Sequence, residues 1–376
     1  MRPPSPYPAL RLLQPLALSI LTLLGVACSK EASEPTPPQN GLPVVTTTTL
    51  QLDWFPEAEH GGFYAAHVHN LYTENGLRVD IRPGGPNAPV LTQVAAGQVD
   101  FGLAGADNIL LGRAEGTQVV ALMASMQDSP QCIMVHEKSG ITQLKDLANL
   151  TLAAEIRLPY VQFLKKNVPL TGVQLVPYTG SVAEFLVKDA YAQQAYAISE
   201  PYVAKSKGGD PRCLMISELG FNPYSTVLIT RKELLEQKPE LVKSMVNASI
   251  AGWKKYLEAP EETNKFINTL NPAMDAQALS FGAEQLKTLV PGTQGAGIGH
   301  LSPERWQTLV SQLESLQLLP PGKVKAEEAY DTRFLPSAPA ATDSAPAPAS
   351  AAPAAAPAAA PAAAPAAAPA AAGSTP

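Results

Sequence analysis

A short stretch in which a strand gives way to a helix constrains the fold of this chain more than any other: residues 52–66, LDWFPEAEHGGFYAA. An apolar strand is expected to stop at Pro56, and the chain then enters a helix through two adjacent glycines. Helix N-termini offer free backbone N–H groups, and glycines let a ligand approach them closely. In an open α/β sheet, ligands bind at this end of the strands. The stretch therefore predicts an α/β protein that binds a ligand.

Predicted strands and helices alternate along much of the chain, in two successive series. In the first series we expect strands at 50–55, 77–81, 100–104 and 118–124, with helices between them. The pattern restarts after residue 127, with strands expected at 132–135, 151–153, 173–176 and 195–198 and a helix at 142–148. Such spacing implies parallel strands joined by right-handed crossovers, with helices on both sheet faces.

Beyond a strand at 225–230 the chain is mainly helical, and Trp253 and Trp306 fall on apolar helix faces as expected core residues. The late helices must pack on an earlier α/β unit, so the chain is expected to start in one lobe, form the second and return to the first. We therefore predict a two-lobed α/β fold with a ligand cleft between the lobes, because ligand sites concentrate at such interfaces. Lobe one is assigned to residues 45–127 plus 226–336 and lobe two to residues 128–225, with hinge motion through the crossings near Gln127 and Ser225.

The N-terminal residues 1–28 are typical of an export signal, with two arginines, an apolar run at 16–26 and small residues before Cys28. The context of Cys28 resembles a lipoprotein signal, which predicts a lipid anchor on this cysteine; ordinary cleavage with a free thiol is the alternative. Residues 29–44 are proline-rich and polar, as in a flexible linker. The folded part is therefore expected in the periplasm or on the cell surface.

The C-terminal residues 337–376 are almost entirely alanine and proline, and a proline every fourth residue favours an extended, disordered tail over a helix. The formal net charge of −6 comes without basic clusters, so nothing indicates nucleic-acid binding. Cys132 and Cys213 remain after Cys28 is set aside. In an oxidising compartment they either pair or stay as two buried thiols in separate strands, and the sequence leaves both possibilities open.

Several motifs occur together in the first series and its continuation: DWFP at 53–56, HGG at 60–62, VAAGQVDFG at 94–102 and RAEG at 113–116. Their combination resembles the extracytoplasmic binding proteins that supply ABC importers with thiamine-pyrimidine precursors, riboflavin or sulfonates. The resemblance covers about residues 47–336. It implies a type II periplasmic-binding-protein fold, an ABC permease as partner, and a small planar heterocycle as ligand, most simply a thiamine-pyrimidine precursor. We expect a monomer.

The same family contains the eukaryotic thiamine-pyrimidine synthase, which offers a test for catalysis. By motif alignment the histidine that the synthase consumes falls at Asn108, and its cysteine-rich run falls at residues 221–224, FNPY. Both departures remove groups that the synthase chemistry needs, so we expect no catalytic residues and no cofactor. The alternatives are a sulfonate- or riboflavin-binding protein, a pyrimidine-synthase-like enzyme, and a surface interaction module that uses the Ala/Pro tail.

The expected ligand contacts come from both lobes. Trp54 is expected to stack on a flat ring; Asp53 either accepts from a ring amino group or caps the following loop. The His60 imidazole is expected to donate a hydrogen bond or cap the Gly61-Gly62 turn rather than bind a metal. The resemblance implies that Glu200 accepts two hydrogen bonds from an aminopyrimidine edge. The remaining expected contacts are His60, Gly61, Tyr64, Asp107, Asn108 and Tyr224, with Arg157 as the one group that would suit a sulfonate or phosphate.

Overall fold

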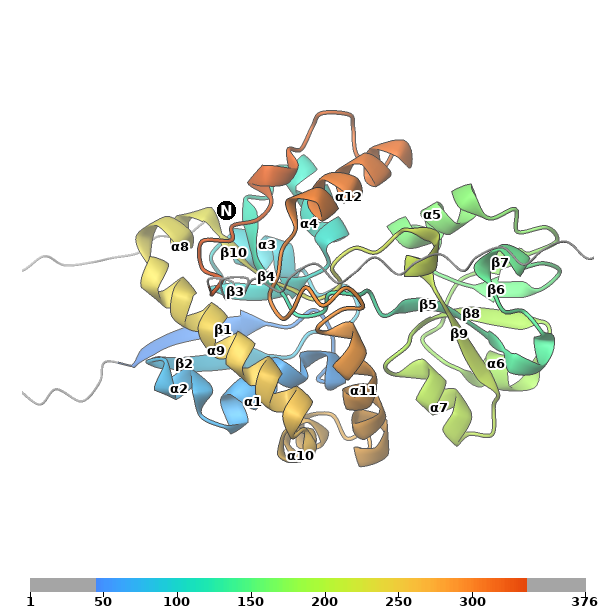
Figure 1. Ribbon diagram of the computed structural model, residues 1–376, viewed down its shortest axis with the longest axis horizontal. Coiled ribbons are helices and arrows are strands. Elements are labelled where there is room, and N and C mark those ends of the chain that lie inside the picture. The colour runs from blue at the N-terminus through green and yellow to red at the C-terminus, as the bar shows by residue number, and fades with distance from the viewer. Residues whose placement is uncertain (1–44, 337–376) are drawn as a thin grey trace, which may run out of the picture. The chain divides into compact units, whose positions relative to one another are not determined.

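The computed structural model describes residues 45–336. The expected signal peptide with Cys28, the linker and the Ala/Pro tail lie outside the described residues. Residues 45–336 belong to one compact unit that contains two five-stranded sheets (Figure 1). Within this range, every helix is too short or too polar to span a bilayer.

Sheet one has the strand order β2-β1-β3-β10-β4. Its strands are β1 (Thr46–Gln51), β2 (Leu77–Arg82), β3 (Phe101–Ala104), β4 (Val119–Ala124) and β10 (Val227–Arg231). β1 pairs in parallel with β2 and β3, but β10 pairs antiparallel with β3 and β4. The expectation of parallel pairing throughout is therefore wrong for β10, because this strand enters sheet one from lobe two and runs against its neighbours.

Sheet two has the order β7-β6-β8-β5-β9. Its strands are β5 (Gln131–His136), β6 (Thr151–Ala153), β7 (Gln174–Val176), β8 (Tyr191–Tyr196) and β9 (Pro211–Met215). β5 pairs antiparallel with both β8 and β9. Three sequence predictions are wrong here: parallel pairing fails for β5, β8 lies earlier than 195–198, and the helix expected at 142–148 is only a 3-10 turn at Leu144–Asp146. The sequence also did not predict β9.

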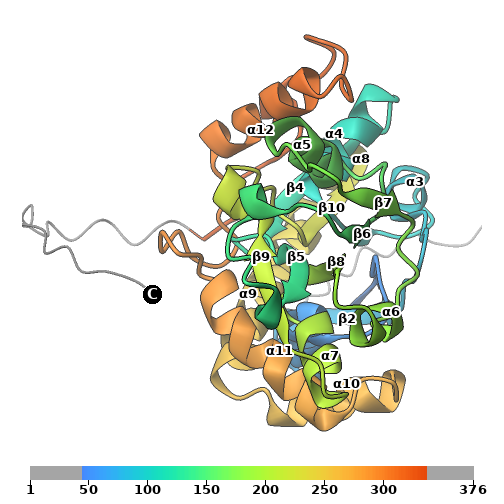
Figure 2. The same cartoon turned by 90° about the vertical axis from the view of Figure 1, so that its right-hand side faces the viewer.

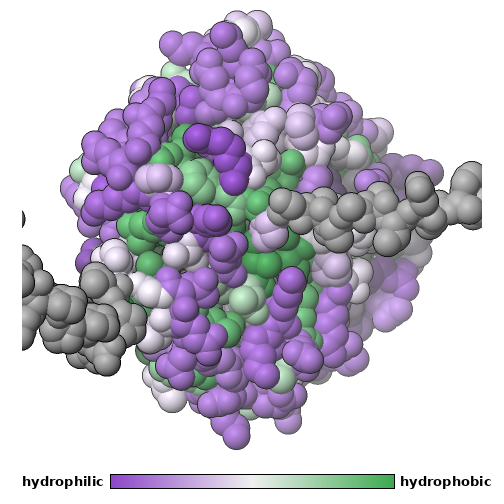
Figure 3. All heavy atoms as spheres, turned by 60° about the vertical axis from the view of Figure 1, so that its left-hand side comes forward, coloured by the Kyte–Doolittle hydropathy of each residue, from purple (hydrophilic) through white to green (hydrophobic). Residues whose placement is uncertain are grey.

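Helices cover both faces of both sheets. They are α1 (Gly61–Val68), α2 (Leu71–Glu74), α3 (Val90–Ala95), α4 (Ala106–Ala114), α5 (Pro159–Asn167), α6 (Ala183–Val187), α7 (Glu200–Ser206), α8 (Lys232–Gln237), α9 (Pro239–Glu258), α10 (Glu261–Leu270), α11 (Ala276–Leu289) and α12 (Pro303–Ser315). Figure 2 brings sheet two to the front and shows α5 on one side of it and α6 and α7 on the other. On the face shown in Figure 3, hydrophilic side chains surround smaller groups of apolar ones.

The two tryptophans expected in the core are both fully buried, and that prediction is confirmed. Trp253 packs on lobe-one side chains around α1 and α9, with its ring edge-on to Phe63 at 6.0 Å between centroids. Trp306 of α12 stacks on Tyr330 at 5.6 Å. Each buried tryptophan side chain contributes about 3 kcal/mol to stability. The late helices thus complete the core that the first strands begin.

Two chain segments connect the sheets, and hydrogen bonds join them side by side. The Asn222 side chain accepts a hydrogen bond from Ser129 N at 2.8 Å and donates one to Asp128 Oδ1 at 2.9 Å. Ser225 Oγ donates to Ser129 Oγ at 2.9 Å. One segment lies between β4 and β5, and the other between β9 and β10. The hinge was predicted in these two segments, and it stays a prediction.

Cys132 of β5 and Cys213 of β9 form a disulfide, with their Cα atoms 5.5 Å apart. The sequence left this pairing open. Only the antiparallel pairing of β5 with β9, in which Cys132 lies opposite Met215 and Cys213 opposite Met134, brings the two thiols together. The bridge therefore joins the first and last strands of lobe two.

Candidate functional site

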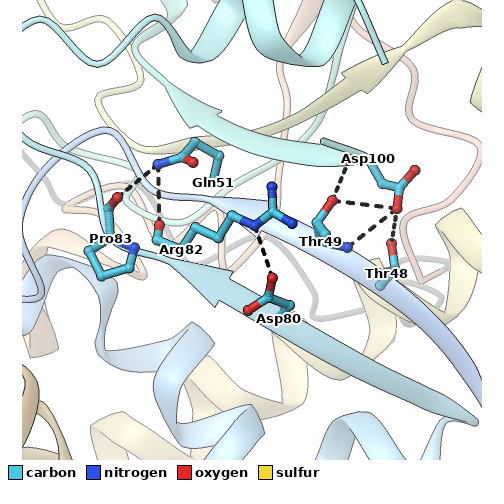
Figure 4. Close-up of polar contacts among 7 residues, drawn as sticks. All are labelled: Thr48, Thr49, Gln51, Asp80, Arg82, Pro83 and Asp100. Carbon is cyan, nitrogen blue, oxygen red and sulfur yellow. Dashed lines mark hydrogen bonds and ion pairs between the residues drawn. The ribbon is translucent and has the colours of Figure 1, made fainter. Parts of the chain in front are cut away.

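The loop after β1 begins the candidate site, and polar contacts with β2 and β3 set its position (Figure 4). The Asp100 carboxylate accepts a hydrogen bond from Thr48 Oγ1 at 2.9 Å. Gln51 Nε2 donates to Pro83 O at 2.9 Å and to Arg82 O at 3.3 Å. The strand ends at Gln51 and not at residue 55, because β2 offers no partner beyond Arg82. The expected strand at 50–55 is therefore wrong at both ends, since β1 begins at Thr46 and ends at Gln51.

Backbone contacts then hold the loop against the segment after β2. Leu52 N donates to Arg82 O at 2.9 Å, and Gly84 N donates to Trp54 O at 2.9 Å. A Cβ atom on Gly84 would lie 2.3 Å from Leu52 O and 2.6 Å from the Asp53 carbonyl carbon, so only glycine fits at this position. The site loop is thus held by backbone groups on both sides.

Trp54 and Phe55 are exposed on this loop. Their side chains are 39% and 46% accessible, and their rings meet edge-on at 5.5 Å between centroids. Large aromatic side chains with this much exposure are uncommon outside binding surfaces when they stand in pairs. The Trp54 side chain lowers the pKa of Glu57 in part, as a neighbouring N–H donor does. The indole is thus held next to a carboxylate while its ring stays accessible.

Asp53, Glu59 and His60 lie together at the end of the same loop. His60 Nε2 is 3.2 Å from Asp53 Oδ1 and 3.5 Å from Glu59 Oε1. His60 and Glu59 are buried, whereas the Asp53 side chain is 35% exposed. One possible metal-ligand atom from each of these three residues lies within 4.8 Å of the other two. His60 Nε2 is in contact with Asp53, and the sequence expectation of no metal stays a prediction.

Lobe two contributes Glu200 at the start of α7. Its carboxylate accepts hydrogen bonds from Ser199 Oγ at 2.7 Å, Tyr196 N at 2.8 Å and Tyr178 OH at 3.1 Å. Tyr160 OH donates to Gln194 Oε1 at 3.1 Å. Glu200 is therefore held in one orientation by donors of its own lobe.

The electrostatics show that groups of the two lobes face each other. Burial, with the negative charge of Glu200 as the next cause, raises the pKa of Glu57 to about 7, and the hydrogen bond from Trp54 lowers it in part. Burial and the charges of Asp53, Glu57 and Glu200 raise the pKa of Glu59 well above its usual value. Burial and the charges of Glu59, Asp53 and Asp107 likewise raise the pKa of Tyr196. The charge of a lobe-two carboxylate thus raises pKa values of carboxyl groups in lobe one.

Asp107 and Asn108 lie in the first turn of α4, as expected. The Asp107 carboxylate is buried and accepts a hydrogen bond from Asn108 N at 2.9 Å, and burial raises the pKa of its carboxyl group. The Asn108 side chain is exposed. Arg157 is also exposed, and it makes no hydrogen bond or ion pair with any residue in the described range. The charge of Asp107 contributes to the raised pKa of Tyr196, whereas Arg157 has no polar partner among the described residues.

Three expected contact residues have packing roles in the structure. A Cβ atom on Gly61 would lie 2.1 Å from the Tyr256 ring, so this glycine allows α1 and α9 to approach closely. Tyr64 is 1% exposed, and its ring lies 5.8 Å from that of Phe266 in the core of lobe one. Tyr224 is 2% exposed and accepts a hydrogen bond from Ser302 N at 2.9 Å. We leave Gly61, Tyr64 and Tyr224 out of the site proposed below.

Sequence reasoning missed three contributors. Glu57 and Glu59 were considered only as metal ligands, and Tyr196 was not considered at all. A signal was present for the glutamates, since two acids one residue apart precede a helix whose first residues are all small or apolar and buried. No local signal identifies Tyr196, because its position depends on where β8 meets the other lobe.

Comparison with known proteins places this arrangement in a family. A family model described as "NMT1/THI5 like" matches residues 57–263. A riboflavin-binding protein, RibY of Chloroflexus aurantiacus, is 24% identical over 86% of this chain and 98% of its own length. A formylaminopyrimidine-binding protein of Halalkalibacterium halodurans is 24% identical over 76% and 90%. Further relatives carry the name of an enzyme: a 4-amino-5-hydroxymethyl-2-methylpyrimidine phosphate synthase of Legionella pneumophila is 23% identical over 60% and 74%.

Among solved structures, the periplasmic aliphatic sulphonate binding protein SsuA of Escherichia coli superposes with a TM-score of 0.60 at 14% identity, over 75% of this chain and 91% of that one. At this identity the likeness establishes the fold alone. The predicted two-lobed type II periplasmic-binding-protein fold is confirmed, and so is the family resemblance found in the motifs.

Proposed function

This chain belongs to the NMT1/THI5-like family, and we propose that it is the extracytoplasmic solute-binding protein of an ABC importer whose two lobes close on a small planar heterocycle. A thiamine-pyrimidine precursor is the proposed ligand. One observation carries the proposal: an exposed indole, Trp54, stands on the loop that carries Glu57, and the charge of Glu200 from lobe two raises the pKa of that same Glu57.

Each proposed contact suits a flat ring with amino and ring-nitrogen groups. Trp54 offers a face for stacking, which adds to the area that an aromatic pair buries. Asp53, held by His60, and Glu200, held by Ser199 and Tyr178, each keep lone pairs for N–H donors of the ligand. Because these groups come from different lobes, a ligand that contacts both favours the closed state over the open one.

We propose binding without turnover, although the family includes synthases. Asn108 stands where the synthase motif has its consumed histidine, and residues 221–224 carry no cysteine. In the structure Phe221 and Tyr224 are buried, and the Asn222 side chain bonds the neighbouring crossing segment, so this stretch has a structural role. A cytoplasmic synthase would also have no use for the export signal that residues 1–28 predict.

The remaining parts of the proposal concern the surroundings of the folded lobes. A lipid on Cys28 would hold the protein at the membrane, and the partner would be the importer's permease. We propose a monomer, because a single chain supplies both lobes of the proposed cleft. These statements rest on the sequence of the N-terminal segment and on family membership.

Native mass spectrometry of the protein purified without added ligand, followed by a melting-temperature screen of aminopyrimidines, flavins and sulfonates, tests the proposal. A bound ligand stabilises the folded chain through mass action and so raises its melting temperature. At a free ligand concentration of a hundred times Kd, the gain in stability is ~3 kcal/mol. We expect aminopyrimidines to raise it, and Trp54→Ala to abolish the rise while Phe55→Ala keeps most of it. A rise in melting temperature with flavins alone would favour riboflavin as the ligand, which is named in the relative RibY. No rise with any of the three classes would refute a solute-binding role.

A further inference from the structure

A short segment of lobe two is buried against lobe one. Ile198 follows β8 of sheet two, yet it is 2% exposed and belongs to the buried apolar cluster that contains Ala58, whose other fully buried members all come from lobe one. Tyr196 and Tyr202 are partly buried against the same cluster. We call residues 196–202 the docking segment, because the core of the other lobe buries its central side chain.

Helix α11 supplies much of the lobe-one side of this contact. Figure 1 and Figure 2 both show α11 next to α7, the helix that begins in the docking segment. A Cβ atom on Gly282 of α11 would lie 2.6 Å from Ala58 Cβ and 3.0 Å from Ile198 O. A side chain at this position would push the docking segment away, so the glycine permits the close approach of the two lobes.

A hydrogen bond and an aromatic contact extend the same interface. Tyr202 OH donates to Gln277 Oε1 at 3.0 Å, and the Tyr202 ring lies 5.7 Å from that of Phe281 between centroids. Residues 277 and 281 are four apart and therefore share one face of α11. One face of a lobe-one helix thus meets the docking segment through a hydrogen bond, an aromatic pair and a close backbone contact.

The docking segment also carries Glu200, the lobe-two residue of the candidate site. The Glu200 carboxylate accepts hydrogen bonds from Tyr196 N at 2.8 Å and Ser199 Oγ at 2.7 Å. Ser199 O in turn accepts one from Tyr202 N at 3.1 Å. These bonds make the segment one compact turn, so the burial of Ile198 by lobe one also fixes where this carboxylate stands.

We infer that the docking segment stabilises the closed state of the lobes in the absence of ligand. Closing places Ile198 against Ala58 and Gly282 and forms the bond from Tyr202 to Gln277. Opening breaks that bond and returns the apolar Ile198 side chain to water, which is unfavourable. The ligand-free chain is therefore a mixture of open and closed states, and these contacts raise the closed fraction.

The consequence for affinity rests on the proposed function. A ligand that binds only the closed state has an apparent Kd equal to its intrinsic Kd divided by the closed fraction. Gln277 and Tyr202 are not proposed ligand contacts, yet they then set how tightly the ligand is held. They act as positioning residues, through the balance of the two states.

Small-angle X-ray scattering of the ligand-free full chain tests the inference first. Tyr202→Phe and Gln277→Ala each remove the hydrogen bond between the lobes, and we expect each to increase the radius of gyration because the closed fraction falls. Tyr330→Phe and Gln307→Ala are the matched controls, at positions of similar exposure near and on α12, and should leave the radius unchanged. The melting temperature shows whether each variant is folded.

Calorimetric titration with formylaminopyrimidine, the compound in the name of one relative, measures the effect on binding. Tyr202→Phe and Gln277→Ala should each weaken the affinity by roughly two- to ten-fold, the range for the loss of one hydrogen bond. The double variant should bind no more weakly than either single variant, because both changes remove the same bond. Gly282→Ala should weaken the affinity further, since it displaces the whole docking segment.

An unchanged radius of gyration in both single variants would overturn the inference. Tighter binding in these variants would overturn it too, because the contact would then hold the lobes apart. Effects that add in the double variant would show that Tyr202 and Gln277 act separately, against the proposed pairing. If formylaminopyrimidine does not bind, the ligand-free scattering decides the inference by itself. A larger radius in the variants together with no binding of any solute would support the docking segment and count against the proposed function.

Discussion

Glu57 shows how a single side chain can set the electrostatics of a two-lobed site. It lies on a lobe-one loop, and after burial the largest cause of its raised pKa is a carboxylate of the other lobe, Glu200. The hydrogen bond from Trp54 offsets only part of this. A carboxyl group held at this pKa is partly protonated near neutral pH, so it destabilises the folded chain when it is ionised and no ligand is present.

The first prediction concerns pH. Because the carboxyl of Glu57 has a pKa of about 7 in the folded chain and 4.5 as its ordinary value, the folded state binds more protons between these pH values. The free energy of unfolding should therefore fall as the pH rises from about 5 to about 8, by at most ~3 kcal/mol from this group. Denaturant unfolding across this pH range measures the fall, and Glu57→Gln should reduce it.

The control for this prediction is Glu115→Gln, whose carboxylate is exposed and should leave the pH dependence unchanged. An identical pH dependence in Glu57→Gln would show that other groups, Glu59 first among them, carry the effect.

At the scale of elements, the segment after β2 supports the loop after β1. Gly84 donates its N–H to Trp54 O and leaves no room for a Cβ atom against Leu52 O and Asp53. The proposed ligand contacts Asp53 and Trp54 thus depend on the backbone of Gly84, which is not a proposed ligand contact itself.

We expect Gly84→Ala to displace this loop and to weaken ligand binding together with stability, by about 1–3 kcal/mol, as overpacking against backbone does. Gly85→Ala is the matched control: its Cβ would meet only the Phe55 ring at 3.3 Å, and a side chain can move. Calorimetric titration and melting temperature of both variants measure the difference. Equal effects in the two variants would argue against support of the loop by Gly84.

The disulfide belongs to the same scale, because it joins β5 to β9 across 81 residues of sequence. Cross-linking a loop of this length stabilises a fold by about 2–4 kcal/mol, mainly through the unfolded state. Replacing both cysteines, Cys132→Ser with Cys213→Ser, should lower the melting temperature, and a reducing agent should lower that of the unaltered chain to a similar value. A reductant without effect on the unaltered chain would mean that the bridge does not form in solution.

At the scale of the whole molecule, the two crossing segments are the expected hinge. Asn222 bonds both Ser129 N and the Asp128 carboxylate, and it therefore holds the two segments together. Two-lobed proteins of this kind move by rotation about a few such residues, and a ligand shifts the population towards closure.

The last prediction follows from this. Ligand should reduce the radius of gyration measured by small-angle X-ray scattering, and Asn222→Ala should change ligand affinity through the balance of open and closed states without any contact to the ligand. Asn167→Ala, at the exposed end of α5 in lobe two, is the control. An unchanged radius on saturation would contradict closure.

Local patterns predicted a substantial part of this structure. Alternating apolar runs and helix faces identified most strands of both sheets, and Trp253 and Trp306 were placed in the core from helix periodicity alone. The loop at 52–60 was recognised from its residue types. These features depend on neighbours in sequence, which is why they can be found without the fold.

The features that were missed depend on residues far apart in sequence. The direction of β10, the existence of β9 and the pairing of Cys132 with Cys213 follow from how strands from distant segments align. Gly61 and Tyr64 were predicted as ligand contacts, and the packing of α1 on α9 and α10 shows a structural use of both residues that the sequence did not indicate. No periodicity in a single segment carries that information.

The sequence by itself determined the two-lobed α/β class, the family and the residues of the first loop, because strand and helix periods and motif spacing are local properties. Only the tertiary structure decided that the charge of Glu200 acts on Glu57 and Glu59, since two crossings must first join the two sheets. Charge interactions depend on distance in space, and a chain of this length sets such distances only once it has folded.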